Sequence, residues 1–270
     1  MKYVIAGAMV AAGLLAHGAV RAADAQTGGD GLGKYIVGDK RSGYVFAEPD
    51  TRAMQDDDFQ NPGMVWVEAG KQLWSTPDGA AGKSCQTCHG DAATSMKGVA
   101  THYPKFNPRV GKVIDLEQRI DMCRAKALQA KPYPWESHEL LAMTTFIKNQ
   151  SRGMPMNVAV DGPAAPFFEK GKESFYRRRG QLDLSCASCH ETLEGRHLRA
   201  DVLSQGQTNG FPTYRLGWQT LGSLQKRIKG CDKQMRADPH AFGSDEYVNL
   251  ELYLAWRGNG LPVETPAVRK

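Results

Sequence analysis

The sequence predicts a mostly α-helical protein that contains two related domains in tandem, and three observations predict this. The pattern Cys-x-x-Cys-His occurs twice, at residues 85–89 and 186–190. Similar segments flank both copies in the same order, which is the signature of an internal repeat. Apolar residues in these segments recur at helical spacing, and strands have little support in the pattern of the chain.

The length and the charge limit the classes of protein that the chain can form. A chain of 270 residues is long enough for two modest domains that each bury a core. It has 34 basic and 29 acidic residues, and two of the basic ones, Lys2 and Arg21, fall in a predicted leader. The remaining charges nearly balance, which excludes a general nucleic-acid binder.

The first 22 residues have the pattern of a signal peptide. Lys2 precedes an apolar run from Val4 to Leu15, and small residues cluster around Ala22, where we expect cleavage. The run is too short to span a bilayer, and no later stretch approaches the ~20 apolar residues that a membrane helix needs. We therefore expect a periplasmic protein without a membrane segment; a retained N-terminal anchor is the alternative.

Composition and repetition divide the rest of the chain. We expect an irregular, polar N-terminal extension over residues 23–62 and a first haem-sized domain over residues 63–155. Residues 156–166, which contain glycine, proline and alanine, form the predicted linker. The second domain then covers residues 167–270.

The two domains share a predicted helix before the Cys-x-x-Cys-His pattern and two helices after it. Gly70 and Gly171 each lie 15 residues before the first cysteine of their pattern, inside segments with helical apolar spacing. The sequence L-x-x-R-I-x-x-C occurs later, at residues 116–123 and 224–231. A final helix in each half is predicted by apolar residues at i, i+3 and i+7, ahead of a Gly-x-Pro sequence. These apolar residues are Leu140, Met143 and Ile147 in the first half and Tyr247, Leu250 and Leu254 in the second.

The Cys-x-x-Cys-His pattern indicates covalent attachment of a c-type haem. Its two thiols bond to the vinyl groups of the haem, and its histidine becomes a ligand of the iron. We therefore predict two covalently bound haem c groups. The predicted attachment residues are Cys85, Cys88 and His89 in the first domain and Cys186, Cys189 and His190 in the second. Zinc is the poorer interpretation, because zinc-binding pairs usually lie about 15 to 20 residues apart, whereas these pairs are about a hundred residues apart.

The two remaining cysteines, Cys123 and Cys231, are candidates for the second axial ligand of each iron. Each closes the repeated L-x-x-R-I-x-x-C sequence, in the region downstream of the histidine that usually supplies this ligand. This interpretation assigns His89 and Cys123 to one iron and His190 and Cys231 to the other. In an oxidising compartment two spare cysteines can instead form a disulfide, for which their Cα atoms must lie within about 7 Å.

A methionine or a histidine could supply this second ligand in place of a cysteine. A methionine at helical spacing is more often part of a core than a ligand. Neither residue type recurs at equivalent positions in the two halves. The candidates of these two types are Met96, Met122, Met143, Met154, Met156 and Met235, together with His102, His138, His197 and His240.

The surroundings of the two spare cysteines differ in charge. Basic residues outnumber acidic ones more strongly around Cys231 than around Cys123, so the second site is the better trap for an anion. A thiolate ligand there would also stabilise ferric iron and lower the reduction potential. The charged residues around Cys231 are Lys226, Arg227, Lys229, Asp232, Lys233 and Arg236, and those around Cys123 are Glu117, Arg119, Asp121, Arg124 and Lys126.

These motifs resemble those of known cytochromes. Each half resembles class I cytochrome c, in which a first and a last helix pack beside a haem that is attached between them. The mature chain as a whole resembles the dihaem SoxA subunit of the SoxAX cytochromes. The resemblance lies in the two Cys-x-x-Cys-His motifs, the R-I-x-x-C sequence that follows each, and the closing Trp-Arg-Gly-Asn-Gly sequence at residues 256–260.

The resemblance to SoxA implies an activity and its partners. It implies a periplasmic heterodimer with the monohaem cytochrome SoxX that acts as an L-cysteine S-thiosulfotransferase. Such an enzyme couples thiosulfate oxidatively to a cysteine of the carrier protein SoxYZ, and two electrons pass through haem to a small cytochrome c. By position, Cys231 matches the catalytic cysteine of the family, which can occur as a persulfide, and Arg227 matches its active-site arginine.

Two further functions fit the same motifs. A thiosulfate dehydrogenase would join two thiosulfates to form tetrathionate, but such enzymes pair a Cys-ligated haem with a Met-ligated one, whereas this chain repeats the cysteine. A dihaem electron carrier without a substrate would need no anion site. The spare cysteines and Arg227 argue against that interpretation.

Overall fold

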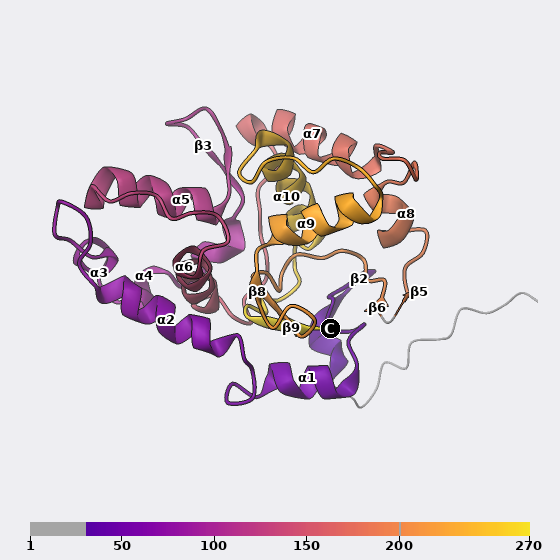
Figure 1. The fold of residues 1–270 in the computed structure, drawn as a ribbon, viewed down its shortest axis with the longest axis horizontal. Coiled ribbons are helices and arrows are strands. Elements are labelled where there is room, and N and C mark those ends of the chain that lie inside the picture. Colours follow the sequence, from indigo (N-terminus) through magenta and orange to yellow (C-terminus); the bar gives the residue numbers. More distant parts are fainter. Residues whose placement is uncertain (1–30, 200) are drawn as a thin grey trace, which may run out of the picture.

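The computed structural model describes residues 31–199 and 201–270 of the chain. Figure 1 shows two groups of helices, with α2, α5 and α6 on the left and α7, α9 and α10 at the upper right. In the described residues helices predominate and every strand has only two or three residues, so the prediction of a mostly α fold with long loops is confirmed. None of the described helices is long and apolar enough to cross a membrane. The predicted signal peptide, residues 1–22, lies outside the described residues.

The first half follows the predicted order of helices, with a β-hairpin added before the helix that ends at Cys123. The hairpin strands are too short for an alternating pattern to reveal them in the sequence. The elements are α2 (Met64–Ser75), α3 (Cys85–His89), α4 (Ala92–Ser95), η2 (Val99–His102), β3 (Lys105–Asn107), β4 (Lys112–Ile114), α5 (Leu116–Cys123), η3 (Arg124–Leu128) and α6 (His138–Asn149).

The second half has its main helices and the hairpin before α9 in the same order, with a β5–β6 hairpin where the first half has α4 and η2, and a last strand follows the closing helix. The elements are η4 (Gly162–Ala164), α7 (Ala165–Tyr176), α8 (Cys186–His190), β5 (His197–Leu198), β6 (Asp201–Val202), β7 (Thr213–Arg215), β8 (Thr220–Gly222), α9 (Leu224–Gln234), α10 (Asp245–Arg257) and β9 (Ala267–Arg269). Strand β7 pairs with β8 in antiparallel fashion and with β9 in parallel fashion. The hairpin before α9 is therefore anchored by the end of the chain.

The N-terminal extension packs against the last strand of the second half. It contains η1 (Leu32–Tyr35), β1 (Ile36–Val37), β2 (Lys40–Arg41) and α1 (Pro49–Asp56), and α1 lies beside the C-terminus in Figure 1. The buried side chain of Gln55 accepts a hydrogen bond from the backbone nitrogen of Val268 at 3.1 Å. Asn61 donates to the carbonyl oxygen of Pro266 at 2.9 Å. These contacts attach the two ends of the described chain to each other.

Each half is held together by a close crossing of its first and last helices. Helix α2 crosses α6 at Gly70, and α7 crosses α10 at Gly171. A Cβ atom at Gly70 would overlap the carbonyl oxygen of Ala142, and one at Gly171 would overlap that of Asn249. Only glycine allows two helix backbones to approach so closely, which explains why both halves place a glycine at the same distance before the first cysteine.

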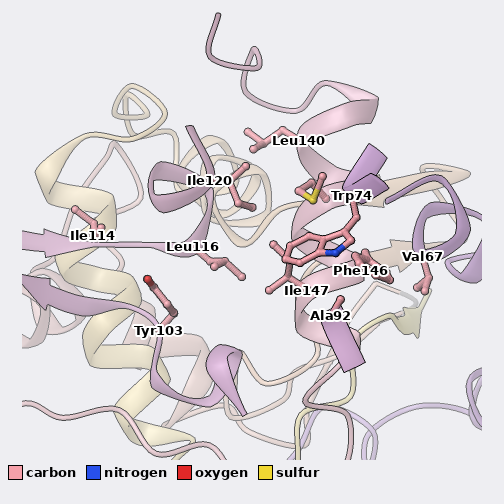
Figure 2. Close-up of a cluster of buried hydrophobic side chains, with 11 residues drawn as sticks. Val67, Trp74, Ala92, Tyr103, Ile114, Leu116, Ile120, Leu140, Phe146 and Ile147 are labelled. Carbon is pink, nitrogen blue, oxygen red and sulfur yellow. The ribbon is translucent and has the colours of Figure 1, made fainter. Parts of the chain in front are cut away.

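Apolar side chains of the closing helices form the cores beside these crossings. In the first half, Trp74, Leu116, Ile120, Phe146 and Ile147 point toward one another (Figure 2). The predicted apolar positions of the closing helices are all buried: Leu140, Met143 and Ile147 in the first core, and Tyr247, Leu250 and Leu254 in the second. The periodicity of the sequence therefore identified the correct face of both helices.

A buried polar contact joins the two halves between α5 and α9. Asp115, the residue that caps the N-terminus of α5, accepts a hydrogen bond from the side chain of Gln225 in α9 at 3.0 Å. The Gln225 oxygen accepts another from the backbone nitrogen of Gly243 at 2.7 Å. Burial raises the pKa of Asp115 well above its ordinary value. The rings of Trp135 and Phe242 stack nearby, with centroids 5.8 Å apart. The helices that carry Cys123 and Cys231 are thus fixed relative to each other.

The crossing at Gly171 predicts a strong effect of one added methyl group. We expect Gly171→Ala to lower the free energy of unfolding by about 1–3 kcal/mol, because the new Cβ must displace backbone atoms of α10. Gly230→Ala in α9 is the matched control, since a Cβ there would meet nothing within 4 Å, and it should leave stability equal or raise it by up to ~1 kcal/mol. Denaturant unfolding followed by circular dichroism measures both. Equal stability of the two variants would contradict the close crossing.

Candidate functional site

The two Cys-x-x-Cys-His segments adopt the same local structure. Each is a single helical turn whose preceding serine caps the first backbone N–H groups. Ser84 accepts a hydrogen bond from the backbone nitrogen of Thr87 at 3.1 Å, and Ser185 accepts one from that of Ser188 at 3.3 Å. The side chains of Thr87 and Ser188 bond back to the capping residues. This reciprocal arrangement fixes the turn from which the two thiols and the imidazole project.

In the first half, the predicted residues line one apolar cavity of about 560 Å³. Cys85, Cys88, His89 and Cys123 all contribute to its wall, together with apolar side chains that include Trp74, Leu116 and Ile120. The volume falls in the range of about 300–1,000 Å³ that is usual for ligand and cofactor sites. The sequence prediction that these four residues act together is consistent with this placement.

The chemistry of the first cavity fits a c-type haem. Two thiols and an imidazole share one apolar wall, as covalent attachment and axial ligation require. Four basic residues also line the cavity, and their charges suit the carboxylates of haem propionates. These residues are Lys105, Arg109, Arg119 and Arg124. Of the alternative methionine ligands, Met96 and Met143 line the same cavity, and Met143 is a fully buried member of the core.

In the second half, the thiols of the motif lie near Cys231. Burial raises the pKa of Cys186 to about 12, and the negative charge of a Cys231 thiolate adds to this rise. Burial and the same charge raise the pKa of Cys189. All six cysteines lie in the described part of the chain and none of them is in a disulfide. The alternative of a bridge between Cys123 and Cys231 therefore has no support in the structure.

The ring of His190 is held in one orientation by its loop. Its Nδ1 atom lies 2.7 Å from the carbonyl oxygen of Ser204. Because a carbonyl can only accept, Nδ1 carries the proton and Nε2 is left with the lone pair that binds a metal. Burial lowers the pKa of His190, the hydrogen bond to Ser204 acts in the opposite direction, and the charges of Arg227 and Arg257 lower the pKa further. The lowered pKa favours the neutral imidazole, which is the form that a metal ligand needs.

Arg257 supports this orientation, and its role was not predicted from the sequence. It donates to the carbonyl oxygen of Gln205 at 2.9 Å and pairs with Glu191 at 3.2 Å, so it ties the loop after the motif to the residue beside His190. The guanidinium also lies 4.4 Å from the centroid of the Phe175 ring. The signal was present in the closing Trp-Arg-Gly-Asn-Gly sequence, but the contact partners lie about 50 to 80 residues earlier.

Helix α9 carries the predicted active-site pair. Arg227 and Cys231 are both within α9, so the expected spacing of one helical turn is present. Lys229, also expected near the thiol, donates instead to the carbonyl oxygen of His240 at 3.0 Å and lies 4.2 Å from the Phe242 ring centroid. The ammonium group of Lys229 is therefore bound to the loop before α10.

The alternative histidine ligands lie elsewhere. His102 bonds to the carbonyl oxygen of Asn157 at 2.9 Å, and His138 packs against Trp66. His240 packs edge-on against Tyr247, and His197 is exposed in β5. None of the four lines the first cavity.

An ion pair next to each spare cysteine occurs in both halves with its charges exchanged. Arg124, which follows Cys123, pairs with Asp78 at 2.9 Å. Asp232, which follows Cys231, pairs with Arg179 at 3.2 Å and accepts a further bond from the Tyr247 hydroxyl at 2.7 Å. Asp78 and Arg179 both lie seven residues before the first cysteine of their motif. The same tether therefore holds the loop before each motif to the helix that carries the spare cysteine.

Comparison with known proteins gives a consistent result. The sequence model of the family "SoxA/TsdA, cytochrome c domain" matches residues 69–156 and 170–263. A protein of that kind carries covalently bound haem c.

Individual relatives agree with the family match. The chain is 50% identical over 231 residues to the L-cysteine S-thiosulfotransferase subunit SoxA of Pseudaminobacter salicylatoxidans, covering 85% of this chain and 80% of that protein. It is 49% identical over 229 residues to the protein of the same name from Rhodovulum sulfidophilum, with coverage of 85% and 80%. Among solved structures, SoxXA from P. pantotrophus superposes with a TM-score of 0.83 at 43% identity, covering 86% of this chain and 87% of that one.

The exchanged ion pairs predict different costs of removing one partner. Arg179→Gln leaves Asp232, whose side chain is 4% exposed, as a buried charge with one remaining hydrogen bond. We expect a loss of about 3 kcal/mol in unfolding free energy. Asp78→Asn should cost ~1 kcal/mol or less, because Asp78 is 45% exposed. Its partner Arg124, although its side chain is only 8% exposed, keeps two bonds to the Lys131 carbonyl and its contact with the Tyr133 ring. Denaturant unfolding of both variants tests this, and a larger loss for Asp78→Asn would refute the assignment of the buried pair.

Proposed function

The chain belongs to the SoxA/TsdA cytochrome c family, and from that premise we propose that it is the catalytic subunit of an L-cysteine S-thiosulfotransferase. In the proposed reaction a carrier-protein thiol and thiosulfate lose one proton and two electrons and form a new S–S bond, which leaves a cysteine S-thiosulfonate. The proposal rests on the arrangement of the second half. Arg227 and Cys231 lie in the same helix, Cys231 lies near Cys186 of the motif, and Arg227 lies near His190.

The proposal includes two haem c groups, one in each half. Cys85 and Cys88 would bond the first and Cys186 and Cys189 the second, and His89 and His190 would bind the irons. Cys123 and Cys231 are the proposed second axial ligands. When bound, the haem of the second half supplies a redox centre from which electrons pass to a small cytochrome c.

The residues of the second half have distinct proposed roles. Arg227 binds the sulfonate end of thiosulfate, because a guanidinium matches the oxygens of such an anion in charge and in geometry. His190 keeps its orientation through Ser204 and Arg257. Cys231 is the proposed catalytic cysteine, and its sulfur holds an additional sulfur atom if the site works through a persulfide. The positive surroundings also favour the thiolate form of an approaching carrier cysteine.

The first half has the same scaffold and a proposed structural role. Its Arg119 and Cys123 match Arg227 and Cys231 of the second half by position. The basic residues that line this cavity would neutralise the charge of the haem propionates. We assign turnover to the second half alone.

The proposed partners follow from the names of the relatives. The solved SoxXA structure pairs a SoxA chain with SoxX, so we propose a heterodimer with a monohaem SoxX for this chain as well. The carrier SoxYZ and the substrate thiosulfate belong to the same proposal. The proposed location is the periplasm, reached through the signal peptide at residues 1–22.

Tetrathionate formation by a thiosulfate dehydrogenase is the second candidate function, because such an enzyme also oxidises thiosulfate at a Cys-ligated haem. The two functions differ in their products. The mass of the carrier protein rises by one bound thiosulfate in the first case, and tetrathionate appears without any carrier in the second. The relatives at 44–50% identity, all named as SoxA, favour the first.

The decisive variants exchange the two spare cysteines separately. In the complex with SoxX, we expect Cys231→Ser to lower the rate of carrier modification on the order of a hundredfold or more, because it removes a group at the reacting centre. Cys123→Ser should cost far less, since the first half does not turn over substrate. Mass spectrometry of the carrier after timed reaction with thiosulfate and an oxidised cytochrome c measures both rates, and the haem content of each variant is the control for folding. Equal losses in both variants would refute the assignment of turnover to the second half.

A further inference from the structure

Because the two halves are repeats, a comparison of their equivalent residues shows which features are particular to the second site. Both α5 and α9 carry an arginine four residues before the spare cysteine, at Arg119 and Arg227. Arg227 alone therefore does not distinguish the two halves. A difference appears in the hairpin that precedes each helix.

The two hairpins have the same register but a different residue at one position. In the first half, the last residue of β3 is Asn107, which pairs with Lys112 at the start of β4. In the second, the last residue of β7 is Arg215, which pairs with Thr220 at the start of β8. Asn107 uses its side chain to accept a bond from the backbone nitrogen of Arg109 at 3.0 Å, which only stabilises its own turn. Arg215 instead places a second guanidinium beside α9.

Arg215 is held beside the start of α9 by the ring of Trp218. Its guanidinium lies 5.3 Å from the centroid of the Trp218 ring, and the ammonium of Lys226 lies 4.9 Å from the same centroid. The Trp218 ring in turn packs so closely on Gly222 that a Cβ there would overlap it. Because Gly222 ends β8 and α9 begins two residues later, this ring ties Arg215 to the first turn of α9, the turn that contains Arg227.

The charge at this place is only partly neutralised. Arg215 is 14% exposed in its side chain and has one ion pair, at 3.2 Å with Asp201, whose side chain is 42% exposed. A guanidinium has several N–H donors in a planar fork, so this single contact leaves donors for a ligand. Arg227 forms no ion pair within residues 31–199 and 201–270. Burial lowers the pKa of Arg215, and the charge of Arg227 lowers it further, whereas a Cys231 thiolate raises it. Arg215 therefore lies close enough to both Arg227 and Cys231 for their charges to act on it.

We propose that Arg215 is the second anion-binding residue of the C-terminal site and that it binds the sulfonate group of thiosulfate together with Arg227. This inference rests on the proposed function and adds to it a substrate-binding residue from outside α9.

Steady-state kinetics of the complex with SoxX test the proposal. At a fixed, saturating carrier concentration, Arg215→Gln should raise the KM for thiosulfate about ten- to a hundredfold, the usual effect of losing a hydrogen bond to a charged group, and should change kcat less. Arg215→Lys keeps the charge and should recover part of the affinity. Arg178→Gln is the matched control, because it removes one positive charge from an exposed ion pair with Asp183 in the same half, and its KM should equal that of the wild type.

A purely structural role of Arg215 makes a different prediction. If Arg215 only anchors the β5–β6 hairpin through Asp201, then Asp201→Asn should raise KM as much as Arg215→Gln does. The proposal expects Asp201→Asn to leave KM unchanged or to lower it, because the partial neutralisation of Arg215 is removed. Calorimetric titration of the oxidised holoprotein with thiosulfate, without carrier, gives the same comparison independently of turnover.

Failure of the proposed function and failure of the inference about Arg215 give different results. A wild-type complex that does not modify the carrier overturns the proposed function. A wild-type complex that does so, with an Arg215→Gln variant whose KM and thiosulfate affinity stay within twofold of the wild type, overturns this inference alone. If Arg215→Gln does not load haem, Arg215→Lys and Asp201→Asn take its place as the test. A KM for thiosulfate that is raised in Arg215→Lys but not in Asp201→Asn supports the proposal. A KM that is raised in Asp201→Asn but not in Arg215→Lys refutes it.

Discussion

The close crossing of the first and last helices in each half is the constraint on which the rest of the structure depends. At Gly70 and Gly171 the backbones approach to a distance that excludes any side chain. The crossing fixes the helix that leads into each Cys-x-x-Cys-His motif against the helix that closes the domain, and the apolar residues beside it form the cores. A cofactor site that needs two thiols, an imidazole and an opposing ligand within one cavity can form only on such a rigid frame.

The two halves use this frame with different electrostatics. The ion pair beside the spare cysteine keeps its place and exchanges its charges between Asp78–Arg124 and Arg179–Asp232. The residue that ends the first hairpin strand is Asn107 in the first half and Arg215 in the second, and the first hairpin has its own basic residue, Arg109, which lines the first cavity. The two halves therefore share a scaffold and differ in where their charges lie. The buried contact between Asp115 and Gln225 joins the two frames into one molecule.

Much of this could be predicted from the sequence, because its signals are local or repeated. The attachment motifs, the R-I-x-x-C sequences and the apolar faces of the closing helices each lie within about a dozen residues, and the second copy of each supported the first. The roles of Arg257 and Gln225 could not be predicted, because their partners lie far away in the chain. The same holds for the packing of Gln55 and Asn61 on the C-terminal strand. The role of Arg215 was missed because no motif marks the short hairpin that places it. Hairpins with strands of three residues were also missed, since so short a segment shows no alternation.

The central claim is that each half binds one haem between its own histidine and its own spare cysteine. The most direct test is the intact mass of the mature holoprotein combined with mass analysis of its peptides. We predict two haems, one on the Cys85–Cys88 pair and one on the Cys186–Cys189 pair, with Cys123 and Cys231 recovered in separate peptides. A single haem, or a peptide in which Cys123 and Cys231 are cross-linked, would contradict it.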